Sequence, residues 1–497
     1  MSVTLLTNRF LREYGRRPLN LVLLAAVPVV FVVLAAQPIA DFAELLGGAG
    51  TGGAQASLTA GWAAAFLAGV AGYFHVLSSR TADRRLASAG MGAGRIVAAR
   101  LLSGLLLAAV ASLGALAALW LRTGLGDPLR ITAITFTFAV LYLAIGTAIG
   151  TSVRNEVNGS LLVVFVWMLD VFLGPGMAGG DVWLTRLFPT HFPTLVALSE
   201  NSGHAGWLGD VAASALWVGG MLALATVLFI RQTRPRGLAG AVRHTVGSVR
   251  LVTGLRYAFR EHRRNLALWL LLFLLPVGFI TLSFAVTPDT PAPVQVPEHG
   301  DQTLLVSMID LHGAIMVPIT VAFLAGLAGM FVVQNSAEAD RRLTLAGFHT
   351  WEVLTARLGV IVGAAVLTTA VSLGVTALDF EPASWVPFTG ATLLVAVQYG
   401  LVGVLVGSLL GRVGGLYMMF LLPFVDVGIA QNVMFAASPP AWGSWLPAHG
   451  PVRMLVDSAF SPSFDTGGAL LLGLAWTAAL AVAGGTIFHR LTRGATQ

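Results

Sequence analysis

Long apolar stretches separated by short polar segments dominate this chain. Each stretch holds about 20 residues, the length that an α-helix needs to cross the roughly 30 Å hydrocarbon core of a bilayer. None of them alternates as the strands of a membrane barrel do. We therefore predict an all-α polytopic membrane protein with twelve transmembrane helices, at residues 19–36, 58–77, 101–121, 131–151, 159–173, 211–230, 266–286, 314–333, 358–378, 388–410, 416–435 and 469–488.

The composition agrees with a membrane protein and excludes several chemistries. Of the 497 residues, 56% are hydrophobic and only 10% are charged, and the mean hydropathy is +0.81. The absence of cysteine excludes disulfides, thiolate catalysis, iron–sulfur clusters and cysteine-ligated zinc. All 29 basic residues are arginine, so the chain lacks the lysine of a Walker A loop. The chain is therefore not itself a P-loop ATPase.

The arginines are distributed unequally between the two sides of the membrane that the predicted spans define. A net charge of +6 could indicate a nucleic-acid-binding protein. With the N-terminus inside, however, all but four of the 29 arginines lie on the cytoplasmic side, the exceptions being Arg122, Arg130, Arg186 and Arg453. We therefore expect a multi-pass protein of a bacterial-type plasma membrane with both termini cytoplasmic, no removable signal peptide and no nucleic-acid partner.

The second half of the chain repeats the first. The segment Ala-Asp-Arg-Arg-Leu at 82–86 returns at 339–343, an offset of 257 residues. Further matches follow in chain order at nearly the same offset: Tyr142 with Tyr399, Gly146 with Gly403, Asp170 with Asp426, and Pro-x-His-x-Pro at 189–193 with the same pattern at 447–451. Coincidences in this order indicate a duplication, with a first repeat at 1–235, a cytoplasmic linker at 236–250 and a second repeat at 251–497.

Six spans in each repeat give both repeats the same orientation in the membrane. An even number of crossings returns the chain to the side on which it started, so the repeats should be parallel and related by a pseudo-twofold axis along the membrane normal. Two bundles arranged in this way enclose a shared seam. A transporter needs such a seam for its substrate, whereas a structural protein gains little from one.

Each repeat carries three further segments in the same order. A basic amphipathic helix comes first, with an apolar stripe of Leu6, Phe10 and Tyr14 in the first repeat and Val252, Leu255 and Phe259 in the second. A plain positive-inside flank is the alternative explanation. A cytoplasmic segment with the Asp-Arg-Arg motif follows the second span, at 78–98 and 334–355. A long, partly apolar outer segment, at 174–210 and 436–468, precedes the last span and should re-enter the membrane edge.

This layout resembles the ABC type-two permease family, the membrane subunits of ATP-driven exporters. The resemblance covers nearly the whole chain and implies a fused permease, in which one chain supplies both six-span halves. It implies that two copies of a separate ATP-binding subunit, which carry the ATP and magnesium, dock on the cytoplasmic segments. This chain would then be a transport subunit rather than an enzyme, with no cofactor or metal of its own. The docking residues would be Asp83, Arg84, Arg85, Asp340, Arg341 and Arg342.

The same arginines also have a simpler explanation, and the substrate stays open. Arginines at this side of the membrane can anchor anionic lipids, although the repeated aspartate beside each pair favours docking. An apolar seam suits a small hydrophobic or amphiphilic substrate such as a drug, an antibiotic or a lipid-like molecule. Surrounding membrane lipids are further expected partners.

Two carboxylates lie well inside predicted spans, Asp170 and Asp426. Burying a carboxylate there costs about 2.5–3.5 kcal/mol, so each should face the bundle interior and have a partner. Candidate partners and neighbours along a substrate path are Tyr142, Tyr399, Trp167 and Gln431. The two carboxylates either contact a polar part of the substrate or carry a proton, or they tie neighbouring helices together as hydrogen-bonded structural groups.

Other functions fit the pattern less well. His191 and His449 have no second ligand at metal-binding spacing, so we predict no metal site. A proton-coupled secondary transporter of the major facilitator kind also has twelve spans and an Asp-Arg motif in corresponding loops. Its loops open with a glycine, however, where this chain has Ser79 and Ser336. A membrane-embedded lipid transferase would need a cluster of catalytic side chains, and the two aspartates are isolated from each other.

Overall fold

The computed structural model divides the chain into two compact units, Met1–Gly247 and Ser248–Gln497. It describes residues 3–16, 18–45, 50, 52–177, 183–198, 202–233, 266–295, 303–345, 350–434 and 439–493. The boundary between the units falls within the predicted linker 236–250, which itself lies outside the described residues, as does the amphipathic helix expected at the start of the second repeat. Of the described residues, 84% are helical.

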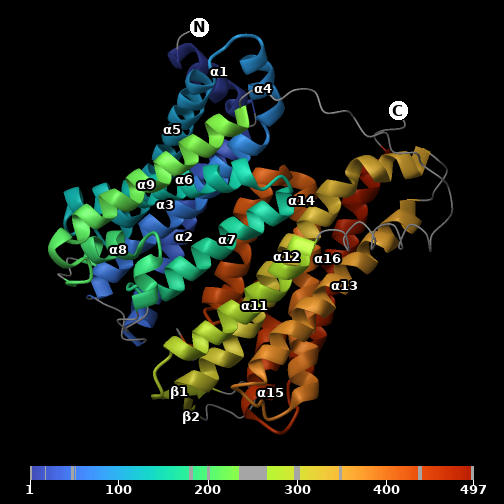
Figure 1. The fold of residues 1–497 in the computed structure, drawn as a ribbon. Coiled ribbons are helices and arrows are strands. Elements are labelled where there is room, and N and C mark those ends of the chain that lie inside the picture. Colours follow the sequence, from blue (N-terminus) through green and yellow to red (C-terminus); the bar gives the residue numbers. More distant parts are fainter. Residues whose placement is uncertain are drawn as a thin grey trace. The chain divides into compact units, whose positions relative to one another are not determined.

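Unit 1 is a bundle of long helices with short helical turns between them (Figure 1). Its elements are α1 (Val3–Gly15), α2 (Pro18–Leu45), α3 (Gly52–Leu77), α4 (Arg80–Ser88), α5 (Ala93–Arg122), α6 (Pro128–Ser152), α7 (Glu156–Leu173), the 3₁₀ turn η1 (Trp183–Leu187), α8 (His191–Leu198), the 3₁₀ turn η2 (Gly206–Leu208) and α9 (Asp210–Thr233). Polar side chains start two of these helices. Asp127 accepts a hydrogen bond from the backbone N–H of Arg130 before α6, and Asn155 caps α7.

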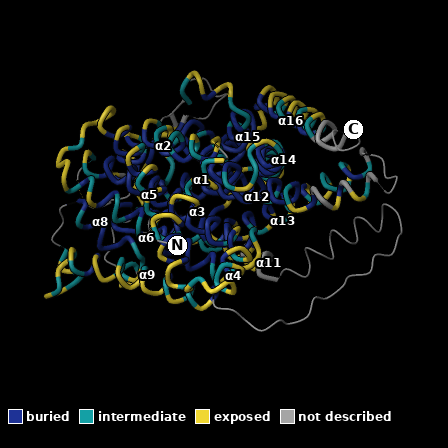
Figure 2. Tube along the Cα trace, turned by 90° about the horizontal axis from the view of Figure 1, so that it is seen from above, coloured by how far each residue is buried: buried dark blue, intermediate teal, exposed yellow. Residues whose placement is uncertain are grey.

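Helix α3 forms the centre of unit 1. It packs against α2, α5, α6 and α7, and 94% of its most apolar stretch is buried (Figure 2). Its contact with α6 is close because Gly146 faces Gly69, where a Cβ on Gly146 would overlap the carbonyl oxygen of Gly69. In contrast, only 22% of the corresponding stretch of α9 is buried, which leaves an apolar outer face. Such a face is typical of a helix in contact with lipid.

Unit 2 follows the same general plan with two differences. Its elements are α11 (Leu266–Val286), β1 (Pro291–Gln295), β2 (Thr303–Ser307), α12 (Met308–Leu345), α13 (Thr350–Thr376), α14 (Trp385–Pro423), the π-helical turn η3 (Phe424–Ala430), the 3₁₀ turn η4 (Gly443–Trp445), α15 (His449–Phe460) and α16 (Gly467–Arg493). The central helix is α12, which packs most extensively on α14. A Cβ on Gly403 would overlap the carbonyl oxygen of Gly326, just as a Cβ on Gly146 would overlap the carbonyl oxygen of Gly69 in unit 1.

The antiparallel pair β1–β2 is a short element that the sequence analysis did not predict, within an otherwise helical set of described residues. Pro291 pairs with Ser307 and Gln295 with Thr303, in the connection between the first two predicted spans of the second half. Two prolines, Pro291 and Pro293, lie on β1. Proline lacks the N–H of a ladder and disfavours a helix, so it is tolerated on a strand with a free edge. The loop therefore forms a hairpin, which a search for helical periodicity does not detect.

The second difference from expectation lies in α12. In unit 1 the central helix α3 ends at Leu77, and a separate short helix, α4, carries Asp83. In unit 2 the single helix α12 continues to Leu345 and carries Asp340 in its last turns. The corresponding segments of the two units therefore have different backbone conformations although their sequences match.

Most of each predicted apolar segment falls on a helix within the described residues. Within the described ranges, nine helices are long and apolar enough to cross a membrane, namely α2, α3, α5, α6, α9, α12, α13, α14 with η3, and α16. The segment Trp385–Ala430 has 46 residues, roughly 70 Å of helix, which exceeds twice the thickness of the hydrocarbon core. It covers the predicted span 388–410 and residues 416–430 of the next one, and Gly411 breaks the helix between them with a φ of 68°. The prediction of a helical, membrane-embedded protein is confirmed.

Candidate functional site

The aspartate of the first Asp-Arg-Arg motif is buried in an ion pair. The Asp83 side chain is 1% exposed, and its Oδ1 lies 3.0 Å from Nη2 of Arg100 at the start of α5. The Ser79 hydroxyl donates a second hydrogen bond to Asp83 over 2.9 Å. Burial raises the pKa of the Asp83 carboxyl, and Arg100 and Ser79 act in the opposite direction. The pair ties α4 to α5.

Helix α1 completes this cluster. The Arg100 guanidinium lies 3.5 Å from the centre of the Phe10 ring, a cation–π contact. Leu6 and Phe10 are buried against Ala99, so the apolar stripe of α1 packs on α5. The predicted amphipathic helix therefore exists in unit 1, and its stripe contacts protein. Through Arg100, this helix and the motif on α4 share one partner.

Unit 2 contains the same ion pair at the same offset. Nη2 of Arg357 lies 2.7 Å from Oδ1 of Asp340, and Nε of Arg357 donates to the same oxygen over 3.1 Å. The Asp340 side chain is 2% exposed. Asp83 and Asp340 are thus internal ion-pair partners rather than surface groups. Their burial leaves the neighbouring arginines of the motif, rather than the aspartates, available for contacts at the surface.

Arg100 and Arg357 are functional candidates that the sequence reasoning missed. Both occur in the repeated sequence Ala-Arg-Leu, 17 residues after the aspartate of each motif. The equal spacing in both halves was a usable signal. The pairing itself was not predicted, because no local periodicity connects a residue on α4 with one on the next long helix.

The arginines beside the buried aspartates differ in their environments. Arg84 is half-buried and donates from Nε to the carbonyl oxygen of Gln232 over 3.1 Å, whereas Arg85 is exposed. In unit 2, Arg342 is exposed, and the side chain of Arg341 lies outside the described residues. The motif therefore presents Arg85 and Arg342 to the surface, each next to a buried, paired aspartate.

The carboxylate within the fifth predicted span of unit 1 is also buried, and it is held by hydrogen bonds. Asp170 is 1% exposed. It accepts a hydrogen bond from the Tyr142 hydroxyl over 2.7 Å and one from the backbone N–H of Thr190 over 3.2 Å. Of the candidate partners, Tyr142 therefore contacts Asp170. The indole N–H of Trp167 donates instead to the carbonyl oxygen of Trp62 over 2.9 Å.

Asp426 has an equivalent set of partners in unit 2. It is 2% exposed and accepts from the Tyr399 hydroxyl over 2.8 Å and from the backbone N–H of Ala448 over 3.0 Å. Gln431 donates a third hydrogen bond over 3.3 Å. The π-helical turn Phe424–Ala430 carries this aspartate, and such turns are frequent at functional sites.

These carboxylates connect the membrane helices with the outer segments. Thr190 and Ala448 each come directly before the histidine of a Pro-x-His-x-Pro element, His191 or His449. Each aspartate therefore joins one helix through tyrosine and the outer segment through a backbone N–H. A buried carboxylate with these donors is satisfied by the protein itself, which favours the structural role among the two that we left open.

The two histidines form hydrogen bonds within their own units. Nε2 of His191 lies 3.0 Å from Nδ1 of His204, and Nδ1 of His449 lies 2.9 Å from Oε1 of Gln431. Burial lowers the pKa of His449, and the positive charge of Arg453 lowers it further. Within the described ranges, no group of three or more potential metal ligands lies together.

No family model matches the chain, and no curated protein is significantly similar to it. Its function must therefore be inferred from its residues and their geometry.

Proposed function

We propose that this chain is the fused permease of an ATP-driven ABC exporter. Its twelve spans would form two parallel six-helix repeats in a plasma membrane, with both termini cytoplasmic. Two copies of a separate ATP-binding subunit, which hold ATP and magnesium, would drive a small hydrophobic or amphiphilic substrate outward. The chain itself would perform no enzymatic step.

The observation that carries this proposal is the recurring buried Asp–Arg pair. Asp83 with Arg100 and Asp340 with Arg357 occur 257 residues apart, each beside an exposed arginine in the segment that resembles a docking helix. A buried ion pair is costly to form, and its fixed geometry is better explained by a specific contact than by stability. An arginine that only anchors lipid needs no buried carboxylate beside it. An arginine that transmits movement from a docked ATPase requires a rigid base.

A charge reversal at the two exposed arginines tests the proposal. Arg85→Glu combined with Arg342→Glu should abolish co-purification of the ATP-binding subunits, because it places like charges opposite an acidic groove. The control is Arg9→Glu combined with Arg12→Glu, which reverses two exposed charges on α1. If both variants are inserted normally but bind the ATP-binding subunits equally well, the docking assignment is wrong.

Transport by the chain alone distinguishes the facilitator alternative. In proteoliposomes that contain only this chain, an imposed proton gradient should drive no substrate movement. Gradient-driven transport without any ATPase would replace the ABC proposal with that of a secondary transporter.

The charge-reversal variant also tests the lipid-anchor explanation of the arginines. If the Arg85→Glu and Arg342→Glu variant is produced at a normal level but is not inserted in the membrane, simple lipid anchoring is favoured.

A further inference from the structure

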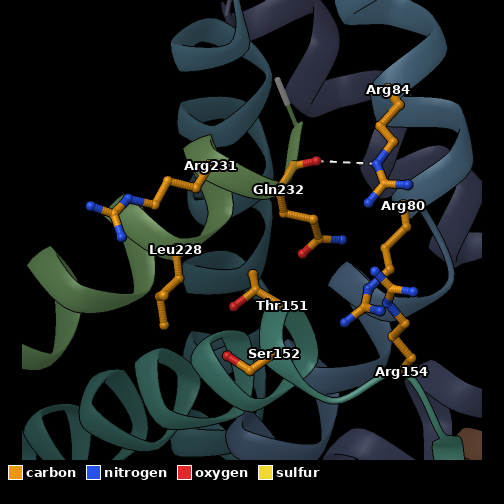
Figure 3. Close-up of a pocket in the computed structure, with 8 residues that line it drawn as sticks. All are labelled: Arg80, Arg84, Thr151, Ser152, Arg154, Leu228, Arg231 and Gln232. Atoms are coloured by element: carbon orange, nitrogen blue, oxygen red, sulfur yellow. Dashed lines mark hydrogen bonds between the residues drawn. The ribbon is translucent and has the colours of Figure 1, made fainter. Parts of the chain in front are cut away.

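A basic pocket lies where α6 and α9 end, beside the start of α4. Its volume is about 300 Å³. Figure 3 shows the guanidinium groups of Arg80 and Arg154 next to each other, with Arg84 above them and Gln232 between these arginines and Arg231. Eight residues line it: Arg80, Arg84, Thr151, Ser152, Arg154, Leu228, Arg231 and Gln232. Four of the eight are arginines and none is acidic.

Backbone carbonyl groups hold two of these arginines in place. Arg80 donates from Nε to the carbonyl oxygen of Gly150 over 3.1 Å and from Nη2 to that of Val153 over 2.9 Å. Arg84 donates from Nε to the carbonyl oxygen of Gln232 over 3.1 Å. A guanidinium has five N–H donors, so both side chains keep further donors for a ligand. Their positions are fixed before any ligand binds.

The positive charge of the pocket is not neutralised by the residues that the structure describes. No described carboxylate forms an ion pair with Arg80, Arg84, Arg154 or Arg231. Burial lowers the pKa of Arg80, and the positive charges of Arg154 and Arg84 add to this effect. An anion in the pocket would relieve this repulsion.

The wall of the pocket continues into an apolar surface. Leu224, Leu228 and Arg231 follow one another at helical spacing on α9, and Leu224 and Val227 are each 47% exposed. At the other side, Gln232 is 8% exposed, and its Oε1 has no hydrogen-bond partner among the described residues. The site therefore combines cationic donors, a free acceptor for a hydroxyl group and an adjoining apolar face.

We propose that this pocket binds the headgroup of an anionic phospholipid from the cytoplasmic leaflet. The phosphate would contact the arginines, a headgroup hydroxyl would donate to Gln232, and the acyl chains would lie along α9. The predicted topology places the ends of α6 and α9 at the cytoplasmic surface, the depth of lipid headgroups. An acidic segment of a partner protein would use the charge but leave the apolar face of α9 without a role. This inference goes beyond the proposed transport function and does not depend on it.

Lipid titration of the purified chain tests the proposal. The full-length protein in detergent is delipidated, titrated with phosphatidylglycerol or with phosphatidylcholine of the same acyl chains, and analysed by native mass spectrometry. We expect one phosphatidylglycerol to bind at least roughly tenfold more tightly than phosphatidylcholine, since each basic residue near a headgroup contributes appreciably to anionic-lipid binding. Glycerol phosphate, the soluble probe, should compete only weakly because it has no acyl chains.

Two double variants provide the matched comparison. Arg154→Gln with Arg231→Gln should remove most of the preference for phosphatidylglycerol, and neither residue belongs to the docking set. Arg9→Gln with Arg12→Gln removes two exposed charges from α1 and should leave the preference unchanged. Arg154→Lys with Arg231→Lys should keep part of it. Equal melting temperatures would confirm that all variants are folded.

Several outcomes would overturn the proposal. The first is equal affinity for the two lipids. The second is an equal loss of the preference for phosphatidylglycerol in the pocket Gln variant and in the α1 Gln variant. The third is tight binding of glycerol phosphate, which would indicate a site for a soluble anion. A pocket variant that keeps its lipid but loses the ATP-binding subunits would assign the pocket to a protein partner. Because the titration uses the chain alone, it stays informative if the exporter proposal fails.

Discussion

At the scale of single residues, Arg100 decides how the Asp-Arg-Arg motif is held. It pairs with the buried carboxylate of Asp83 and covers the ring of Phe10, so it connects three helices of unit 1. A salt bridge at the surface contributes little to stability, but removal of one partner from a buried pair leaves an uncompensated charge. The consequences can be measured on folded protein without knowledge of the substrate.

We expect Arg100→Gln to destabilise unit 1 by about 3–5 kcal/mol, because Asp83 then stays buried without its cation. Asp83→Asn in the same chain should restore part of this loss. Thermal unfolding in detergent measures both changes, and Arg95→Gln, at an exposed position on α5, is the control. If Asp83→Asn gives no recovery in the Arg100→Gln background, the ion pair is not the source of the effect.

The same variant should respond to pH in a defined direction. Burial already raises the pKa of Asp83, and loss of Arg100 removes an interaction that lowers it. The folded protein then binds the proton more tightly than the unfolded chain does, so this contribution to stability is present at low pH and disappears as the pH rises through the folded pKa. The stability deficit of Arg100→Gln should therefore shrink on acidification. A deficit independent of pH would contradict this assignment.

Asp170 and Asp426 are the other residues for which the structure changes the expectation. Each accepts hydrogen bonds from a tyrosine hydroxyl and from a backbone N–H of the outer segment. Asparagine offers one oxygen in place of two, so Asp170→Asn leaves a donor unsatisfied. We expect a loss of about 1–3 kcal/mol, and less than an additive loss when Tyr142→Phe is combined with it.

The second unit provides an internal replicate of this double-mutant cycle. Asp426→Asn and Tyr399→Phe should behave in the same way, because the hydrogen bond there has nearly the same length, 2.8 Å against 2.7 Å. Variants that unfold at the wild-type temperature but no longer transport substrate would contradict the structural role and restore the substrate-path interpretation.

At the scale of elements, close helix packing depends on glycine at matched positions. Gly146 on α6 and Gly403 on α14 each face a backbone carbonyl oxygen of the central helix, Gly69 or Gly326. A backbone atom cannot move aside as a flexible side chain can, so an added methyl group forces the helices apart.

Gly146→Ala and Gly403→Ala should each cost at least about 1–3 kcal/mol, measured as a drop in unfolding temperature. Gly219→Ala on α9 is a matched control, because no atom lies within 4 Å of its added Cβ. That substitution should be neutral or stabilising, since alanine has the higher helix propensity. Equal effects at all three positions would show that close approach does not limit the packing.

Most elements were predictable from the sequence, and the exceptions have identifiable reasons. Most of each predicted apolar segment lies on a helix, because burial in lipid or in a helical core selects a long uninterrupted apolar stretch. The hairpin β1–β2 was missed because its short, proline-containing strands carry no helical pattern. The continuation of α12 through Leu345 was also missed. The motif forms a separate helix, α4, after α3 in unit 1, so matching sequences do not indicate whether the helix continues.

At the scale of the whole molecule, the proposed function predicts a stoichiometry. One fused chain should carry two ATP-binding subunits, one on each half, and native mass spectrometry of the purified complex would count them. Arg85→Glu alone should remove one subunit, and Arg342→Glu alone should remove the other. Retention of both subunits by each single variant, or loss of both, would contradict independent docking on two halves.

The sequence by itself indicated a helical membrane protein, the positions of its apolar segments and the repeat of its motifs. These properties are encoded in composition and in spacing along the chain, so they can be read without coordinates. Only the tertiary structure decided that Asp83 pairs with Arg100 rather than facing a partner, and that Asp170 and Asp426 bind the outer segments. It also brought four arginines from α4, α9 and the α6–α7 junction to one pocket. Such contacts join residues far apart in the chain, and they form because helix packing, rather than local sequence, sets which side chains meet.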